Sequence, residues 1–167
     1  MRPEGEPIHQ SDEVTPLQLI EAGGRTALVC VTDQALSERI AQAVRKLNYH
    51  VVVAQDPSSI LSRMEFDQYQ LIVLDERFGG KDSADNPMLL HLQRLPMPLR
   101  RKSFLCLLSQ EAPTLDHMAA FLIGANVMLN LQDVEKLPVI LERLVKDHET
   151  LYAVFVDELT ERGASAV

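Results

Sequence analysis

Short aliphatic runs alternate with amphipathic stretches from Thr26 onward, and this alternation constrains the fold more than any other feature of the chain. Five runs are candidates for strands: residues 27–31, 51–54, 71–74, 104–108 and 126–129. The first three are continuously apolar, as in parallel strands covered on both faces. Because crossovers between parallel strands are right-handed, the pattern predicts an α/β fold with a doubly wound, five-stranded parallel sheet.

The stretches between these runs carry helix signals. After the first run, apolar residues at spacings of four, four and three form one helical stripe: Leu36, Ile40, Val44 and Leu47. Thr32 or Asp33 can cap this helix, and the pairs at 56–57 and 86–87 place a capping residue before a first-turn proline. Further helices are predicted over 114–123, before Gly124, and from 133 to about 162. Segment 95–101 contains two prolines and should form neither helix nor strand.

Composition excludes several classes of function. The formal net charge of -8 argues against nucleic-acid binding, and the basic run at 100–102 is expected to be a solvated loop. Cys30 and Cys106 lie within aliphatic runs and are expected to be buried hydrophobes, while the five histidines share no ligand spacing. No signal peptide and no membrane-length apolar run is evident, so we expect a cytoplasmic protein with no metal and no membrane partner.

The chain divides into three parts. Residues 1–25 are predicted to be a flexible acidic tail or linker, rich in proline and acidic side chains. Residues 26–147 contain the five strand–helix units and form the predicted domain. Residues 148–167 extend the last helix and end in a short tail. A linker at the start is compatible with a chain taken from a longer protein.

Polar residues follow the predicted strands where parallel sheets bind ligands, at their carboxyl ends. Asp33 with Thr32 follows the first run, Asp75 the third and Ser109 the fourth. Two carboxylates and a hydroxyl are therefore expected to converge. That arrangement is typical of Mg²⁺-assisted phosphoryl transfer.

This placement resembles the receiver domains of two-component response regulators over residues 26–147. Segment 124–129, Gly-Ala-Asn-Val-Met-Leu, also resembles the element that leads into the fifth strand of receivers. The resemblance implies that Asp75 occupies the phosphoacceptor position. It also implies that Asp33 is the second member of the metal-binding acidic pair and that Ser109 is the hydroxyl that senses the phosphoryl group.

Four positions depart from the receiver pattern. Thr32 replaces the first acidic residue, Leu131 the essential lysine, Gln132 the proline that follows it, and Met128 the aromatic switch. An isobutyl group cannot stabilise phosphoryl charge as an ammonium does, and a lost carboxylate weakens Mg²⁺ binding. At most a weak Mg²⁺ site remains at Asp33 and Asp75, so we expect no cofactor.

Three further features bear on this site and its surroundings. Arg77 lies on the loop after Asp75, and we hypothesise that its guanidinium neutralises Asp33 and Asp75 in place of a metal ion, with a solvent-directed side chain as the alternative. The polar loop 79–86 is either a recognition element or a tolerated insertion. In the last helix, Leu151, Tyr152, Phe155 and Leu159 continue an apolar stripe beyond the domain. This stripe should pack on its own domain, on a second copy in a homodimer, or on another protein.

The interpretation that follows is a pseudo-receiver, a signal-transduction module that binds protein partners without phosphorylation and is not an enzyme. The alternative is a response-regulator receiver that a histidine kinase still phosphorylates at Asp75 in a phosphorelay. A flavodoxin-like domain that binds a small molecule is a third possibility, which the lack of a glycine-rich phosphate cradle disfavours.

Overall fold

The structure, a computed structural model, describes residues 23–164 of the chain, with side chains as far as residue 154. The strands are β1 (Thr26–Cys30), β2 (His50–Val53), β3 (Leu71–Asp75), β4 (Phe104–Ser109) and β5 (Val127–Asn130). The α-helices are α2 (Gln34–Arg45), α3 (Pro57–Met64), α4 (Pro87–Arg94), α5 (Met97–Arg100), α6 (His117–Ile123) and α7 (Leu137–Ala164), with a 3₁₀ helix, η1 (Leu131–Lys136), before α7.

All five strands are parallel, in the order β2-β1-β3-β4-β5. The central strand, β3, lies between β1 and β4, so that Val73 pairs with Val29 on one side and Cys106 on the other. The order reverses direction after β1, as in a doubly wound sheet. The predicted fold class is therefore confirmed.

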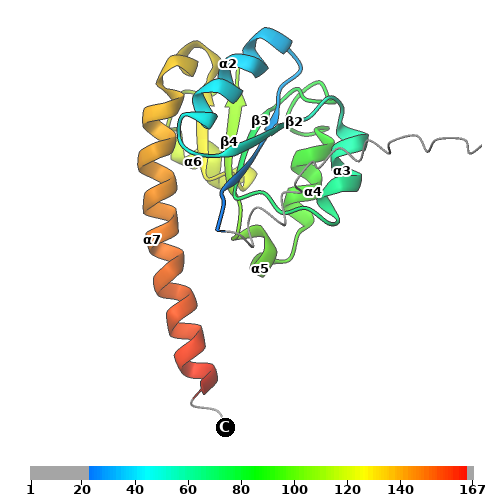
Figure 1. Cartoon of the computed structure of the whole chain (residues 1–167). Coiled ribbons are helices and arrows are strands. Elements are labelled where there is room, and N and C mark those ends of the chain that lie inside the picture. The colour runs from blue at the N-terminus through cyan, green and yellow to red at the C-terminus, as the bar shows by residue number, and fades with distance from the viewer. Residues whose placement is uncertain (1–22, 165–167) are drawn as a thin grey trace, which may run out of the picture.

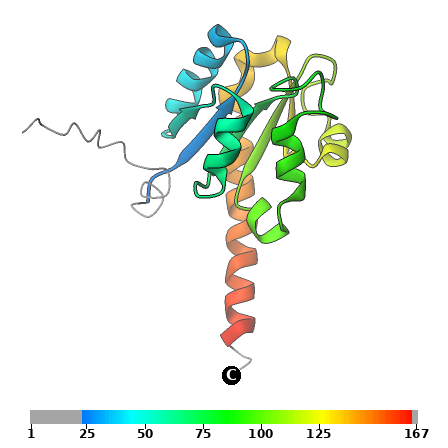
Figure 2. The same ribbon diagram turned by 90° about the vertical axis from the view of Figure 1, so that its right-hand side faces the viewer.

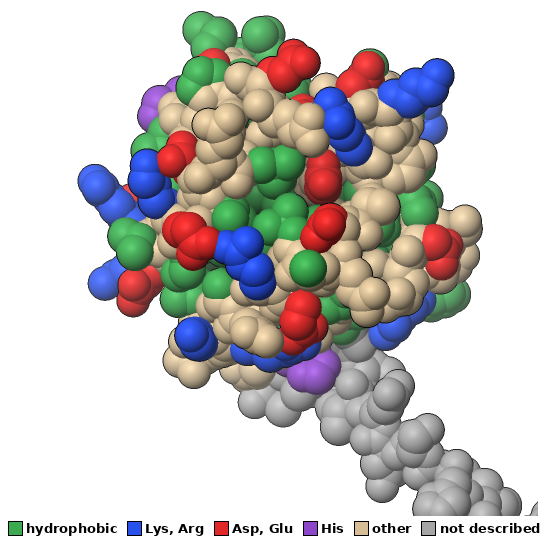
Figure 3. Space-filling model, turned by 90° about the horizontal axis from the view of Figure 1, so that it is seen from above, with side chains coloured by type: hydrophobic (Ala, Val, Ile, Leu, Met, Phe, Trp, Pro, Cys, Tyr) green, Lys and Arg blue, Asp and Glu red, His purple; other side chains and the backbone are tan. Residues whose placement is uncertain are grey.

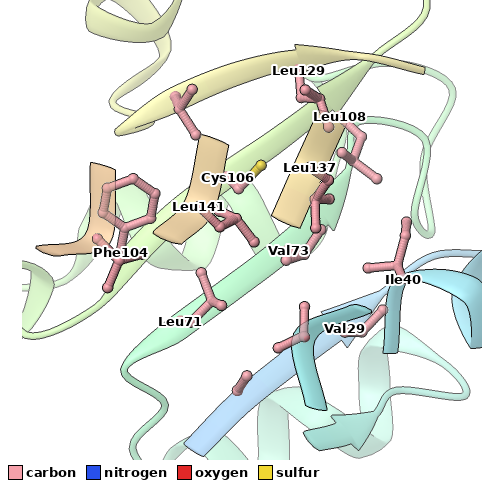
Figure 4. Close-up of a cluster of buried hydrophobic side chains, with 14 of the residues drawn as sticks. Val29, Ile40, Leu71, Val73, Phe104, Cys106, Leu108, Leu129, Leu137 and Leu141 are labelled. Carbon is pink, nitrogen blue, oxygen red and sulfur yellow. The ribbon is translucent and has the colours of Figure 1, made fainter. Parts of the chain in front are cut away.

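The two faces of the sheet bury separate apolar clusters. One face packs against α2 and α7 through residues such as Ile40, Leu137 and Leu141 (Figure 4). The other packs against α3, α4 and α6. Strands β1, β3 and β4 are buried along their whole length, which is why their runs are apolar without alternation. Both cysteines are free and buried, as predicted, and burial raises the pKa of the Cys106 thiol to about 12.

Side-chain caps set the starts of four helices. Asp33, Asp56, Asn86 and Asp116 each accept a hydrogen bond from the backbone N–H three residues further on. Each satisfies a donor that the first helical turn leaves unpaired. Of the two residues that the sequence offered as the cap of α2, Asp33 takes that role. Gly124 ends α6 as predicted, with a positive φ of 81°.

Three helical segments differ from the sequence-based prediction, whereas each strand end lies within one residue of its predicted position. Segment 95–101 contains the short helix α5, because Pro96 and Pro98 stand at its first positions, where a helix does not need their missing N–H groups. Helix α6 begins at His117 rather than near Thr114, since Asp116 provides the cap. The final helix starts as η1 and becomes α-helical only at Leu137.

Helix α7 starts at the carboxyl edge of the sheet and runs past the amino edge, in both perpendicular views (Figures 1 and 2). Its 28 residues span about 42 Å at 1.5 Å per residue. Arg25, which we assigned to the tail, braces it: the guanidinium lies 2.7 Å from the Tyr49 hydroxyl and 2.5 Å from a carboxylate oxygen of Glu149. No helix in the described part of the chain is long and apolar enough to span a membrane.

Candidate functional site at the carboxyl edge of the sheet

The candidate site is built by the residues that end or follow β1, β3, β4 and β5. The strand order places Asp75, the last residue of the central strand, beside the end of β4, where it pairs with Leu108. Ser109, the next residue of β4, pairs with Asn130 of β5. The sheet thus positions the ends of β3, β4 and β5 side by side, as the strand-end rule predicts.

Asp75 is buried, with 8% of the residue exposed. One carboxylate oxygen accepts a hydrogen bond of 2.9 Å from the backbone N–H of Arg77. Desolvation raises the pKa of this carboxyl group, the Arg77 N–H opposes that effect, and the neighbouring charge of Glu76 raises the pKa further. Asp75 is thus a carboxylate whose charge is poorly compensated.

Asp33 is used differently. Its carboxylate accepts a 2.7 Å hydrogen bond from the backbone N–H of Leu36 as the cap of α2, and both Asp33 and Thr32 are exposed. The group that the resemblance assigns to an acidic metal-binding pair therefore acts as a helix cap. No cluster of three or more His, Cys, Asp or Glu side chains that could hold a metal ion occurs among residues 23–164.

Ser109 holds the loop that follows β4. The residue is 2% exposed, and its hydroxyl oxygen accepts hydrogen bonds from the N–H groups of Glu111 and Ala112, at 3.2 and 3.1 Å. A carboxylate oxygen of Glu76 accepts a further bond, 2.8 Å long, from the N–H of Gln110. Glu76 is not among the predicted site residues, although it directly follows Asp75.

Arg77 does not form the ion-pair cluster that we hypothesised. It touches Asp75 through its backbone N–H, its side chain is exposed, and the ion pairs formed within the described residues include none from Arg77. Its charge is the weakest of the influences on the Asp75 pKa. A residue two positions beyond the strand end follows the turn outward, so the solvent-directed alternative describes it better.

Three of the residues that depart from the receiver pattern lie in β5 or directly after it. Leu131 opens η1, is half-buried, and packs against the apolar cluster beneath α2 and α7. Met128 is 1% exposed, within the cluster on the opposite face. Gln132 is exposed, and its N–H donates to the side chain of Asn130. Two of the replaced polar or aromatic positions are thus part of the hydrophobic packing.

A polar network that sequence reasoning missed closes this edge beside β5. The Asn130 amide donates to the carbonyl of Ala112 at 2.9 Å, and the Asn130 N–H donates to the Thr114 hydroxyl, also at 2.9 Å. That hydroxyl donates to Asp133, which pairs with Lys136. A groove of about 820 Å³ adjoins these residues and is lined in part by Leu115 and exposed Val139. The sequence signal for this network was the polar residue Asn130 at the end of an apolar strand.

Seen along the strands, this edge of the molecule mixes charges of both signs with apolar side chains (Figure 3). The loop after β3 closes on itself: Asp85 accepts hydrogen bonds from the N–H groups of Lys81 and Asp82. Asn86, fully buried, donates to the carbonyls of Asp75 and Glu76. Some polar residues of loop 79–86 thus stabilise the loop itself through hydrogen bonds. The role of this loop in recognition stays a prediction.

Two apolar surfaces lie outside this edge. On α6, Met118, Phe121 and Leu122 are 67–80% exposed, which the sequence analysis missed. The signal was a helix in which every residue after His117 is apolar, so that apolar side chains lie on all its sides. On α7, Leu151 is 67% exposed and Tyr152 half-buried, while the side chains of Phe155 and Leu159 lie outside the described part.

The fold is that of response-regulator receiver domains. Similar structures include the receiver domain of a Francisella response regulator (TM-score 0.59, 18% identity, 74% of this chain and 98% of that one) and one from Methanospirillum hungatei (0.59, 16%, 76% and 98%). The receiver domain of a histidine kinase from Syntrophus aciditrophicus is also similar (0.59, 15%, 74% and 92%). No family model matches the sequence, and no curated protein does.

Proposed function

We propose that this chain is a signal-transduction module of the receiver type that acts through protein–protein contacts without phosphorylation of Asp75. The observation that carries the proposal is the surroundings of Asp75: its hydrogen bond comes from a backbone N–H, and no ion pair reaches it within the described chain. A phosphoryl group there would place about two negative charges where the carboxylate has one, and no cationic side chain forms an ion pair with Asp75 in the described chain.

The neighbouring positions support the same proposal. Leu131 packs into the core where the resemblance implies a lysine. Asp33 caps α2 in place of joining an acidic pair, and Ser109 already holds the loop after β4. We propose no enzymatic activity for this module. We also propose that it functions in a reducing cytoplasm, which agrees with its two free, buried cysteines.

The alternative is a receiver that a histidine kinase still phosphorylates at Asp75. One observation favours it: Asp75 ends β3 beside Leu108, the residue before Ser109 in β4, so the acceptor and hydroxyl positions lie at neighbouring strand ends. Bound Mg²⁺ could in that case compensate part of the charge. The two functions differ in whether Asp75 reacts, which can be measured directly.

The test is an amide NMR titration of the isotope-labelled full chain with Mg²⁺ and beryllofluoride, which mimics a phosphoryl group on an aspartate. We expect signals of residues near Asp75 and Ser109 to stay in place. The Asp75→Ala variant is the matched negative control, and a receiver of established phosphorylation is the positive control. Large shifts in the wild type that disappear in Asp75→Ala would overturn the proposal and establish the alternative.

A further inference from the structure

The last helix leaves the domain with part of its apolar surface uncovered. Buried side chains of α7 end at Val145, and His148 is half-buried against the Phe104 ring and the Arg101 carbonyl oxygen. Beyond it, Leu151 and Val154 are 67% and 60% exposed. We define the α7 extension as residues 148–164. It projects past the amino edge of the sheet in both views (Figures 1 and 2).

The extension continues the stripe that α7 uses inside the domain. Leu144, His148, Leu151, Phe155 and Leu159 follow at spacings of three or four, so helical geometry places them on one side. Inside the domain this side faces the sheet. Past the edge Leu151, the next residue of this stripe, is exposed, so a second helix can lie against it.

The charged side chains in this part of α7 are mostly negative. Between residues 147 and 162 the sequence has five acidic side chains against Arg162: Asp147, Glu149, Asp157, Glu158 and Glu161. Two extensions aligned in parallel would bring Asp157, Glu158 and Glu161 of the two copies together, which is unfavourable. A partner for the extension should therefore present basic residues alongside apolar ones.

Such a surface is present on the chain itself, around α5. Residues 93–102 contain four basic side chains and no acidic one. Met97 and Leu99 of α5 are 56% and 47% exposed, so α7 of the same chain does not cover them. Arg94 and Lys102 on either side are exposed as well. In Figures 1 and 2, α5 lies at the same amino edge past which the extension projects.

We propose that the α7 extension is a self-association element, in which two copies pair their extensions antiparallel and each acidic end lies against the partner's α5 surface. An antiparallel pair with a two-fold axis is isologous and closes as a dimer. With the axis near Val154, residue 160 of one copy lies level with residue 148 of the other. His148 contacts Arg101 in its own domain, so the acidic end of the partner reaches the basic segment.

The test begins with sedimentation equilibrium of the full chain at low and high salt. We expect a dimer that weakens as salt rises, because the pairing is partly electrostatic. Replacing Leu151 and Val154 by Ser should weaken association by about tenfold or more, since both lose apolar contact area. The matched control, Met118→Ser with Phe121→Ser on α6, should leave association unchanged.

Orientation is tested by cysteine cross-linking. Thr160→Cys mixed with Lys102→Cys should form a disulfide-linked pair, whereas Thr160→Cys alone should not. Efficient cross-linking of Thr160→Cys to itself would establish a parallel pair and overturn the proposal. Both native cysteines are buried and should not interfere.

Other occupants of the stripe give different outcomes, each of which would overturn the proposal. A dimer lost in the α6 control variant would place the interface on α6. A monomer in which deletion of residues 1–22 increases hydrogen exchange in the extension would mean that the N-terminal segment covers it. A monomer unchanged by that deletion would leave the stripe without a partner in this chain. None of these outcomes depends on whether Asp75 reacts, so self-association and the proposed function can fail separately.

Discussion

At the scale of single residues, Leu131 links the proposed loss of phosphorylation to stability. The side chain is half-buried against the core, where the resemblance implies a lysine. We expect Leu131→Lys to lower the free energy of unfolding by about 1–2 kcal/mol through lost packing. Leu131→Met, which conserves volume, should cost less than about 1 kcal/mol. Urea denaturation of both variants checks this, and equal stability of the two would show that Leu131 is not a packing residue.

A second residue-scale prediction concerns the pH dependence of stability at Asp75. Because burial raises the pKa of this carboxyl, the folded state binds its proton more tightly than the unfolded state does. Ionised Asp75 therefore costs stability above the folded-state pKa, and that cost disappears below the ordinary pKa of 3.8. We expect Asp75→Asn to raise Tm at pH 7, and to raise it much less as the pH approaches 3.8.

The control for this prediction is Asp33→Asn. Asn is as good a helix cap as Asp, so this exposed carboxylate should be replaceable at pH 7 with little change in Tm. Thermal denaturation followed by circular dichroism at both pH values measures the two variants. A Tm for Asp75→Asn that is lower than wild type at pH 7 would mean that the charge of Asp75 is compensated in the folded state.

At the scale of residues, the sequence predicted positions that the backbone and the strand order determine, but it did not predict the direction of exposed side chains. Asp75 and Ser109 end apolar runs, and the strand order places the ends of β3 and β4 side by side, while the convergence of the two side chains stays a prediction. Arg77 follows in a turn, and nothing in its neighbours encodes where a long exposed side chain points. The buried role of Asn86, with two donors to backbone carbonyls, likewise depends on a loop path that no periodicity describes.

At the scale of elements, the strands were predictable because continuous burial demands continuous apolar runs. Helices with one apolar stripe, such as α2, were equally clear. Helix α5 was missed because two prolines suggest a break, although both lie at its start where they are tolerated. The exposed face of α6 was missed because the six apolar residues after His117 do not indicate which side of the helix the sheet covers.

His148 gives an element-scale prediction for α7. Desolvation lowers the pKa of this imidazole, the hydrogen bond to the Arg101 carbonyl opposes that shift, and the charges of Arg100 and Glu149 act in opposite directions. A lowered pKa means that the folded state binds the proton less tightly. Stability is therefore complete above the ordinary pKa of 6.5 and is lost as the pH falls through the folded-state value below it.

We expect this loss to be localised where α7 leaves the domain. Hydrogen exchange of amides 145–152 should accelerate in the wild type between pH 7 and pH 5, after correction for intrinsic rates. The His148→Gln variant, which can still donate to the Arg101 carbonyl, should show a smaller change. Parallel acceleration in both proteins would assign the effect to other groups.

At the scale of the whole molecule, the domain and the α7 extension differ in what holds them. The domain has two buried apolar clusters that share one sheet. The extension is tied to the domain at its base, by Arg25 to Glu149 and by the ring contact of His148 with Phe104. These contacts fix the direction of α7 as it leaves the sheet, while the next turn exposes Leu151 and Val154. The domain therefore positions the extension, but the packing of the domain does not depend on it.

Truncation tests this division of the chain. A protein ending at Thr150 keeps Val145, His148 and Glu149, and should lose no more than about 1 kcal/mol of unfolding free energy, because most side chains removed from the described part are exposed. A protein ending at Leu144 also loses the buried Val145 and the brace from Arg25, and should lose about 2–4 kcal/mol. Both are measured by urea denaturation at a concentration where the full chain is monomeric. If ending the chain at Thr150 costs as much as ending it at Leu144, the extension is an integral part of the domain, and its exposed stripe is not available to a second copy.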